Sequence, residues 1–243
     1  RHPATGRHDG PAGHARDGAG DECVWSLPDI DPTSDADRAV GDVRDALDST
    51  LADVETDGLA VAFSGGVDSA LLAARLDVPL YVAGFPDSHD VAAAQSAARL
   101  LDRDLRVVEL DHGMLERAVP PLADAIGRTD AMAVQITLPL FLVARRVAAD
   151  GFDRLALGQG ADELFGGYAK VARAPDDPRV EAETVRGARD EMLGTLPDQL
   201  ERDVLAMRGA GVEPVTPLLH DSVVRAALSL PEDLLVTARG ERK

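Results

Sequence analysis

The sequence predicts an α/β fold, in which a parallel sheet carries helices on both faces and is followed by a helical carboxy-terminal part. Short apolar runs of strand length alternate with longer segments of helical periodicity between residues 59 and 157. Strands joined through helices become parallel neighbours by right-handed crossovers, and such a sheet is buried on both faces. The 243 residues, 45% of them hydrophobic, are enough for one domain of this kind.

The first expected helix begins after Ser34, which offers an N-cap, with Asp37 three residues later in a capping-box pattern. Apolar residues then follow at spacings of three and four, which defines one helical face. They are Val40, Val43, Leu47, Leu51 and Val54. The preceding residues 1–35 are rich in Gly, His, Asp and Pro, so we expect a linker or the tail of a preceding domain there.

Strands and helices then alternate, which predicts a Rossmann-like sheet. The expected strands are Leu59–Phe63, Pro79–Phe85, Leu105–Leu110 and Arg154–Leu157. The expected helices are Val67–Leu76, an alanine-rich helix that is capped by Asp90 and ends near Leu101, and Ile136–Ala149. Residues 180–243 are expected to be wholly helical, most clearly over Ser222–Leu230.

The charge of the chain excludes several classes of partner. Its 43 acidic and 25 basic side chains give a formal net charge of −18, which repels nucleic acids and anionic membranes. We therefore expect no nucleic-acid partner and no membrane partner. Only Lys170 and Lys243 are lysines, and this Asp-rich, Lys-poor composition indicates a salt-loving (halophilic) source, with an ordinary acidic protein as the alternative. Equal stability in low and multimolar KCl would contradict that origin.

The sequence carries no pattern of export. The longest apolar run, around Leu138–Ala144, is too short to span a membrane, and the start lacks the apolar core of a signal peptide. The single cysteine, Cys23, excludes a disulfide framework within the chain. We therefore expect a cytoplasmic protein. Because residue 1 is Arg and the chain stops at Lys243, we expect it to be a segment of a longer protein.

Residues 64–69 carry the clearest functional signal, because they lie between the first expected strand and the helix that follows it. Paired glycines let the backbone approach an anion, and N–H groups at a helix start favour phosphate. Asp68 alone would repel phosphate, but it suits a magnesium ion bound to that phosphate. The alternative is a turn whose glycines serve only geometry. The predicted nucleotide-binding residues of this loop are Phe63, Ser64, Gly65, Gly66, Val67, Asp68 and Ser69.

This loop resembles the SGGxDS loop of ATP pyrophosphatases, which cleave ATP between its α and β phosphates. It is not a Walker loop, because no Gly-Lys-Ser/Thr follows it. The resemblance implies that the chain uses ATP and releases pyrophosphate. It does not separate the several enzyme classes that share the loop.

A second acidic motif follows the fourth expected strand, at residues 157–168. Gly158 and Gly160 keep the strand-end loop open to a ligand, and Asp162 and Glu163 are expected to start the next helix. Together with Asp68, Asp162 is expected to hold Mg²⁺ on the departing pyrophosphate. The alternative, strongest for Glu163, is that the two acids only cap the helix.

Residues 157–168 resemble the GxGADELFGGY segment of glutamine-hydrolysing asparagine synthetases, and looser similarity covers most of the chain. The resemblance implies an adenine nucleotide alpha hydrolase-like fold for residues 36–243, truncated at the carboxyl end. It implies that residues 1–35 are the tail of a glutaminase-like domain. It also implies that the backbone of Val82 to Gly84 meets the adenine, and that Lys243 offsets charge at the α-phosphate.

The sequence departs from that family's pattern at positions that bear on the substrate. Gln159 stands where the family usually has Glu, so an amide replaces a carboxylate that could manage protons. Val215 and His220 stand where the family has Arg and Asp. No amino-terminal cysteine is present as a glutaminase nucleophile, and the alternative for Lys243 is an exposed terminal residue.

The resemblance implies an AMP-forming ligase that converts aspartate to asparagine through an aspartyl adenylate, with nitrogen from ammonia or glutamine. The catalytic residues that it implies are Asp162, Gln159 and Lys243. A glutaminase domain, upstream or on another chain, and a second copy in a homodimer are the expected protein partners. Two alternatives are a different amidating or cyclising ligase, similar to β-lactam synthetase, and a non-catalytic ATP-binding regulatory module.

Overall fold

A computed structural model of the chain describes residues 12–17, 20–167 and 184–236. These residues form two compact units, and the division falls inside two long helices. The sheet unit comprises Ala46–Gly160 and Leu200–His220. The second unit comprises Arg1–Asp45, Ala161–Gln199 and Asp221–Lys243. Each unit is described by itself.

The sheet unit is built on five strands in the order β5-β4-β3-β6-β7, and every neighbouring pair is parallel. The strands are β3 (Leu59–Ala62), β4 (Leu80–Gly84), β5 (Leu105–Glu109), β6 (Arg154–Ala156) and β7 (Glu213–Val215). The predicted parallel α/β fold is therefore confirmed, and all four expected strands are present. The strand order reverses at β3, because the chain moves outward to β4 and β5 and then returns to pair β6 on the other side.

β7 corrects the expectation that residues 180–243 are wholly helical. The N–H of Leu157 donates to the carbonyl of Val215 at 2.9 Å, which continues the pairing of β6 with β7. The strand has three residues and contains Pro214, which cannot donate to a ladder and is tolerated on an edge strand. So short a strand carries no alternation from which the sequence could predict it.

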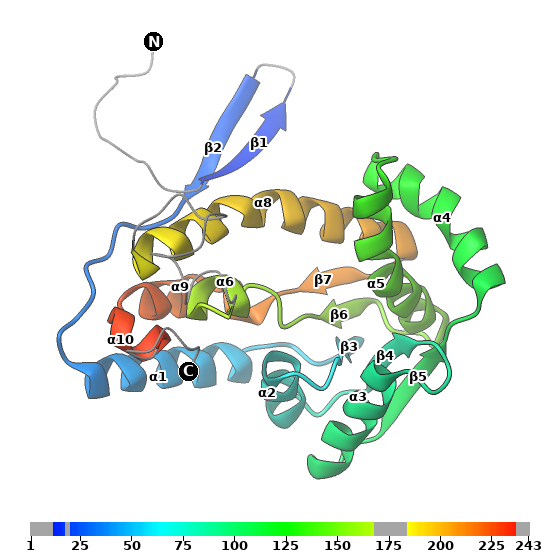
Figure 1. The fold of residues 1–243 in the computed structure, drawn as a ribbon, viewed down its shortest axis with the longest axis horizontal. Helices are drawn as coiled ribbons and strands as arrows, with labels where there is room; N and C mark the ends of the chain where they lie inside the picture. The colour runs from blue at the N-terminus through cyan, green and yellow to red at the C-terminus, as the bar shows by residue number, and fades with distance from the viewer. Residues whose placement is uncertain (1–11, 18–19, 168–183, 237–243) are drawn as a thin grey trace. The chain divides into compact units, whose positions relative to one another are not determined.

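Four helices cover the two faces of this sheet (Figure 1). They are α2 (Val67–Arg75), α3 (His89–Leu100), α4 (His112–Ile126) and α5 (Ala131–Ala149). α2 and α3 lie on one face, and α5, with α4 beside it, lies on the other. The sequence did not predict α4, because Pro120 and Pro121 inside it argue against a helix.

The largest core cluster joins the sheet to α4 and α5. Ala60, Tyr81, Val108 and Leu155 point from successive strands into it, and their neighbours along each strand point to the other face. Among the described residues, only α5 is long and apolar enough to cross a membrane by length and composition. Eight of its buried residues pack in this core, such as Phe141.

A polar cluster lies at the amino edge of the sheet, where β4 and β5 begin and α5 ends. The Tyr81 hydroxyl donates to Asp150 Oδ2 at 2.7 Å, and Arg106 donates to both of these groups. Arg146 donates to the other oxygen of Asp150 at 2.9 Å. The Arg106 guanidinium also lies 5.6 Å from the ring centroid of Phe152. Each carboxylate oxygen of Asp150 therefore has a donor.

These contacts change the acidity of two groups in the cluster. Burial raises the pKa of Tyr81, and the hydrogen bond to Asp150 adds to that rise. The hydrogen bond from Tyr81 lowers the pKa of Asp150, and the Arg146 guanidinium lowers it further. Both shifts favour the ionised carboxylate and the neutral phenol in the folded chain.

The second unit is mainly helical. Its elements are β1 (Ala12–Asp17), β2 (Gly20–Ser26), α6 (Ala161–Phe165), α9 (Asp221–Leu228) and α10 (Glu232–Leu235), with the first part of α1 (Ala36–Ala52) and of α8 (Val185–Ala210). A small core of Ala39, Leu230 and Leu235 packs against Phe165. The predicted helix at the acidic motif is thus present as α6. The predicted helix of residues 222–230 is present as α9.

Arg189 of α8 is buried in this unit and donates to the carbonyls of Ala227 and Leu228 at the end of α9, at 3.1 and 3.5 Å. Burial lowers the pKa of its guanidinium. Burial raises the pKa of the neighbouring Asp190. A buried arginine therefore donates to two carbonyls in the last turn of α9, where carbonyls lack partners within the helix.

Two helix caps differ from the predicted ones. The side chain of Asp35, rather than Ser34, accepts the N–H of Arg38 in the first turn of α1, at 3.0 Å. Ser88, rather than Asp90, caps α3, because its hydroxyl accepts a backbone N–H three residues later at 3.3 Å. Several cap-forming residues precede each helix, so the sequence alone leaves the choice between neighbours open.

The stretch 1–35 contains local structure that the sequence did not predict. β1 and β2 pair as an antiparallel hairpin, with an irregularity between Gly13 and His14. Backbone pairing forms this hairpin in a segment with few apolar residues. The assignment of residues 1–35 to a preceding domain stays a prediction.

Candidate functional site

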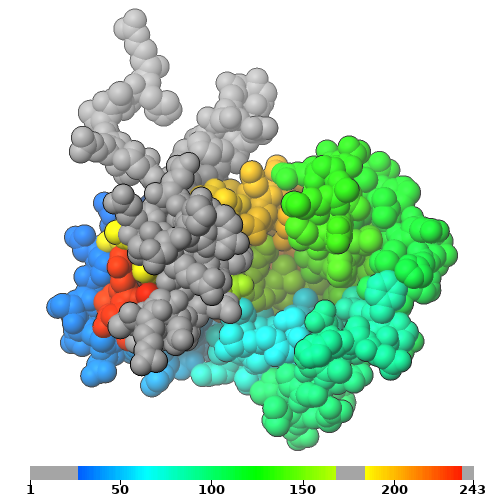
Figure 2. All heavy atoms as spheres, in the orientation of Figure 1, coloured from blue at the N-terminus to red at the C-terminus, as the bar shows by residue number. Residues whose placement is uncertain are grey.

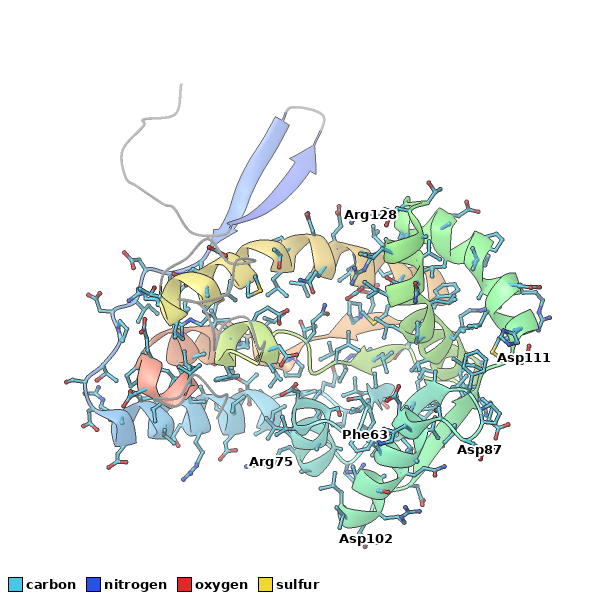
Figure 3. The ribbon with its side chains drawn as sticks, viewed as in Figure 1. Phe63, Arg75, Asp87, Asp102, Asp111 and Arg128 are labelled. Atoms are coloured by element: carbon cyan, nitrogen blue, oxygen red, sulfur yellow. The ribbon has the colours of Figure 1, made fainter. Side chains whose placement is uncertain are left out.

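The loop of residues 64–69 leaves the carboxyl end of β3, the strand at which the sheet order reverses. Ligands of parallel α/β sheets bind at such a switch point. Phe63, labelled in Figure 3, is buried and donates its N–H to the carbonyl of Tyr81, which extends the pairing of β3 with β4. Gly65 has φ +79°, and a Cβ there would lie 2.8 Å from Ala94 Cα of α3. Only glycine fits this turn.

The hydroxyl groups of two serines form hydrogen bonds inside the loop of residues 64–69. Ser64 Oγ and Ser69 Oγ lie 3.2 Å apart, and Ser64 Oγ also accepts the N–H of Gly66 at 3.3 Å. Ser69 Oγ donates to the Gly66 carbonyl at 3.1 Å. The pair holds the loop in one conformation across the start of α2.

α2 begins at Val67 with Gly66 as its cap residue, so the cap has no side chain that could satisfy the first N–H groups. Val67 is 80% exposed, and α2 (cyan) reaches the surface in Figure 2. An open helix start with two flanking hydroxyls favours an anion. Asp68 belongs to the same first turn and brings a carboxylate to it.

The loop after β6 lies directly against this turn. A Cβ at Gly158 would lie 2.9 Å from Asp68 Cβ and 3.2 Å from the N of Ser69. Gly160 has φ +95°, and a Cβ there would lie 2.2 Å from the side chain of Leu219. The two glycines predicted to keep the loop open therefore let it approach α2 on one side and Leu219 on the other.

Gln159, between these glycines, makes a contact that the sequence did not predict. Its Nε2 donates to Asp203 Oδ2 at 2.8 Å, and Arg202 Nε donates to Asp203 Oδ1, also at 2.8 Å. Asp203 is 8% exposed. The sequence gives no indication that α8 reaches a loop 44 residues away.

The predicted adenine contact falls at the end of β4. Val82 is buried inside the sheet, and the Gly84 carbonyl accepts the N–H of Leu110 at 2.9 Å. Beyond this strand end, the rings of Phe85 and His112 lie 5.5 Å apart between centroids. Asp87 and Asp111, which follow β4 and β5, are labelled nearby in Figure 3. Of the predicted stretch, Gly84 is the part at the strand end.

Asp162 and Glu163 lie in the first turn of α6, in the second unit. Glu163 is buried and Asp162 is exposed. A Cβ at Gly167 would lie 1.8 Å from Asp162 Oδ1, so this glycine makes room for the carboxylate. Because Asp68 belongs to the sheet unit, the predicted sharing of Mg²⁺ by Asp68 and Asp162 stays a prediction. Lys243 lies outside the described residues.

Comparison with known proteins finds one matching family model and several similar proteins. A family model described as asparagine synthase matches residues 42–192. A protein of Methanocaldococcus jannaschii that is named as a glutamine-hydrolysing asparagine synthetase is 35% identical over 179 residues, which are 72% of this chain and 33% of that protein. Asparagine synthetase B of Escherichia coli is 26% identical over 230 residues, which are 84% of this chain and 40% of that protein.

The chain thus spans between a third and two fifths of the length of these relatives. Among solved structures, an NH3-dependent NAD synthetase from Campylobacter jejuni matches 55% of this chain and 61% of that one, with 15% identity and a TM-score of 0.35. A TM-score of that size carries no argument about the site. The family model, in contrast, spans both the loop after β3 and the loop after β6.

Proposed function

The chain belongs to the asparagine synthase family, and on that premise we propose that it is the ATP-using part of a longer ligase that makes asparagine from aspartate. The observation that carries this proposal is the meeting of two loops at the carboxyl edge of the sheet. Gly158, in the loop after β6, lies against Asp68, in the first turn of α2. The proposal assigns residues 36–243 to this domain and residues 1–35 to the tail of a preceding glutaminase-like domain.

The loop after β3 suits the triphosphate of ATP. The start of α2 offers backbone N–H groups, and Ser64 and Ser69 add hydroxyl donors beside it. Phe63 and the Val82 to Gly84 backbone would form the adenine end of the site. The glycines at 65 and 158 let the loop after β3 pack against α3 and the loop after β6 pack against α2, which brings the two loops together at the proposed site.

A carboxylate in an anion site fits a hard cation that binds the same phosphates. Mg²⁺ is bound in proteins by one or two carboxylates together with substrate phosphates. Asp68 is the proposed ligand in the sheet unit, and Asp162 is the proposed second ligand. Bound Mg²⁺ would neutralise charge on the pyrophosphate as it leaves.

The proposed reaction has two steps. An oxygen of the aspartate side-chain carboxylate attacks the α-phosphorus of ATP, the bond to the β-phosphate oxygen breaks, and pyrophosphate leaves. Ammonia then attacks the carbonyl carbon of the aspartyl adenylate, the bond from that carbon to the phosphate oxygen breaks, AMP leaves, and the nitrogen loses a proton to solvent. The protein acts by positioning and by offsetting charge. Lys243 would offset charge at the α-phosphate, and Gln159 would contact the acyl group or the nucleophile.

A second ligase function is favoured by three residues that line the same edge. Gln159 stands where the family usually has Glu, and Val215 and His220 replace its Arg and Asp. Leu219 lies against Gly160, and the N–H of Leu157 donates to the carbonyl of Val215, so these differences gather next to one loop. A relative similar to β-lactam synthetase would use the same ATP site with a different carboxylic acid.

The partners of the longer protein follow from the same premise. We propose a glutaminase domain, upstream or on another chain, as the source of ammonia. A cytoplasmic location and a homodimer are further proposals. Neither nucleic acid nor membrane is proposed as a partner, because the net charge of −18 repels both.

The test is pyrophosphate release from Mg-ATP by the full-length protein in high KCl, with aspartate plus ammonia and then aspartate plus glutamine. Aspartate-dependent release with asparagine formed supports the proposal. Release that requires another acid supports the second ligase function. ATP binding with no release for any acid supports a regulatory module instead.

The variant Asp68→Asn sharpens this test, because it keeps the size of the side chain and removes its charge. We expect release to fall about 100-fold, as for other losses of transition-state charge stabilisation. Asp124→Asn, at an exposed position of α4, is the matched control and is expected to keep full activity. Equal activity of the two variants would contradict the role of Asp68.

A further inference from the structure

Gln159 is held in one orientation by a neighbour that the reaction scheme above does not use. Asp203 has two carboxylate oxygens, and each is occupied by a different donor. Arg202 Nε binds Oδ1, and Gln159 Nε2 binds Oδ2, both at 2.8 Å. The side chains of Arg202 and Asp203 are 13% and 12% exposed, so this pair is largely shielded from water.

The orientation of the Gln159 amide follows from these contacts. If the amide were reversed, its carbonyl oxygen would face a carboxylate oxygen at hydrogen-bond distance, and two acceptors repel each other. The NH2 group must therefore face Asp203. The carbonyl oxygen, Oε1, is therefore the amide atom that does not face Asp203. A residue of α8 fixes this orientation.

Oε1 of Gln159 is buried, and no donor within residues 12–17, 20–167 and 184–236 satisfies it. Buried acceptors without a donor are rare in folded proteins, and each one calls for a partner. Two neighbouring contacts define the place. Gly158 lies against Asp68, and Gly160 lies against Leu219. The unpaired oxygen thus belongs to the loop that borders the first turn of α2.

The chemistry of the site limits what can satisfy this oxygen. Phosphate oxygens and ionised carboxylates only accept hydrogen bonds, so neither the triphosphate of ATP nor the reacting carboxylate supplies the missing donor. A nitrogen nucleophile does, because ammonia and amines carry N–H groups. An N–H directed at Oε1 leaves the nitrogen lone pair free to point elsewhere.

We propose that Asp203 is a positioning residue that turns Gln159 so that its carbonyl oxygen accepts an N–H of the attacking nitrogen. This inference rests on the function proposed above and names the ligand of one side chain in it. Gln159 orients the nucleophile without taking its proton, because an amide oxygen is not a base at neutral pH. The ligand class is ammonia or a small amine.

The decisive variant is Asp203→Asn, which keeps the shape of the side chain and replaces one of its acceptors by a donor. The introduced amide has one oxygen instead of two. The Arg202 guanidinium takes that oxygen, because hydrogen bonds from charged donors are the stronger ones. The introduced NH2 then faces Gln159, whose amide must turn round and present its own NH2 where Oε1 had been. In the complex with ammonia, an N–H of Gln159 would then face an N–H of the nucleophile.

We expect the KM for ammonia to rise about tenfold in Asp203→Asn, which corresponds to about 1.4 kcal/mol. The KM values for ATP and for the acid are expected to stay within about twofold of wild type. Asp198→Asn, an exposed change on the same helix, is the matched control and should change none of them. The assay is pyrophosphate release by the full-length protein at saturating ATP and acid with varied ammonium.

A rescue variant separates this role from a structural one. In the double variant Gln159→Glu with Asp203→Asn, the introduced NH2 donates to one oxygen of the introduced carboxylate, and the second oxygen of that carboxylate restores an acceptor at the free position. We expect its KM for ammonia to return to within about threefold of wild type. Gln159→Glu alone opposes two carboxylates, so we expect a lower melting temperature than that of the double variant.

Three outcomes would overturn the inference. An unchanged KM for ammonia in Asp203→Asn, with acid-dependent release intact, rejects it and leaves the proposed function standing. A loss of stability with equal rises in all three KM values, and no rescue by the double variant, assigns Asp203 a structural role only. Absence of acid-dependent release from the wild-type protein with ammonia rejects the proposed function and this inference together.

Discussion

The two edges of the parallel sheet use their polar side chains in opposite ways. At the amino edge, Tyr81, Arg106, Arg146 and Asp150 satisfy one another, and each oxygen of Asp150 has a donor. At the carboxyl edge, the chain turns on glycines, the start of α2 has no capping side chain, and Gln159 keeps an unpaired oxygen among the described residues. We call the amino edge the closed edge, because its polar groups pair with one another, and the carboxyl edge the open edge, because we propose that a ligand pairs with its groups.

The direction of the strands explains this difference. All five strands run the same way, so the helices that follow them start at the carboxyl edge and end at the amino edge. Helix starts leave N–H groups that favour anions, and helix ends leave carbonyls that favour arginine. Arg146 lies in the last turn of α5, beside its C-cap residue Asp150. Stability and ligand binding can therefore be changed separately at the two edges.

The largest expected effect is at Gly158, where the open edge is tightest. In Gly158→Ala, the added methyl would lie 2.9 Å from Asp68 Cβ, so the first turn of α2 must move. We expect pyrophosphate release to fall about 100-fold, roughly 2.7 kcal/mol, because small misplacements of reacting groups cost that much. Denaturant unfolding should show a smaller loss, about 1–2 kcal/mol for a local overpacking.

Gly194→Ala is the matched control for this change. A Cβ at Gly194, inside α8, meets no atom within 4 Å. We expect unchanged activity and a gain of about 0.5–1 kcal/mol in stability, because alanine is the better helix former. If Gly158→Ala lost more stability than activity, the carboxyl edge would be structural like the amino edge, and the contrast would fail.

The second largest effect is expected at the closed edge, where a change should lower stability and leave the KM for ATP unchanged. Tyr81→Phe removes the hydroxyl that bridges Arg106 and Asp150 and leaves the ring in the core. We expect a loss of about 1.5 kcal/mol in the free energy of unfolding, as for hydrogen bonds to charged partners. The KM for ATP, measured well below the melting temperature, should stay within about twofold of wild type. A change in that KM would mean that the two edges are coupled.

The sequence was sufficient to predict the elements whose pattern is local. Each of the strands β3 to β6 lies in a short, mostly apolar segment, and the loop of residues 64–69 follows the first of them. β7 was missed because three residues with Pro214 carry no alternation. α4 was missed because local rules exclude a helix through Pro120 and Pro121, whereas the packing of Ala118 and Leu122 on the core favours one.

The candidate site likewise contains residues that local patterns predicted and a contact that they did not. Residues 64–69 and 158–160 were predicted from glycines and strand ends, and the fold brings these two loops together. The contact of Gln159 with Asp203 was not predicted, because it joins residues 44 positions apart and depends on where α8 lies. No periodicity or motif encodes a hydrogen bond of that kind. Asp162 was placed correctly on a helix, and its role as a ligand stays a prediction.

The smallest expected effect is a change of stability with pH, and the direction of that change distinguishes the closed edge. The hydrogen bond from Tyr81, followed by Arg146, lowers the pKa of Asp150 in the folded chain. A lowered pKa stabilises the fold above the unfolded value, near 4, and this stabilisation is lost as the pH falls through the folded value. The stability difference between wild type and Asp150→Asn, measured by denaturant unfolding, should therefore shrink on acidification.

Asp190, in the second unit, provides the opposite sign within the same titration. Burial raises the pKa of its carboxyl, so its stability contribution is complete below the unfolded value and is lost as the pH rises through the folded value. Asp190→Asn should therefore gain on wild type as the pH rises from about 4 towards 7, whereas Asp150→Asn falls further behind. If both variants moved in the same direction, net charge rather than these local contacts would govern the acid response, and Asp150 would no longer distinguish the closed edge.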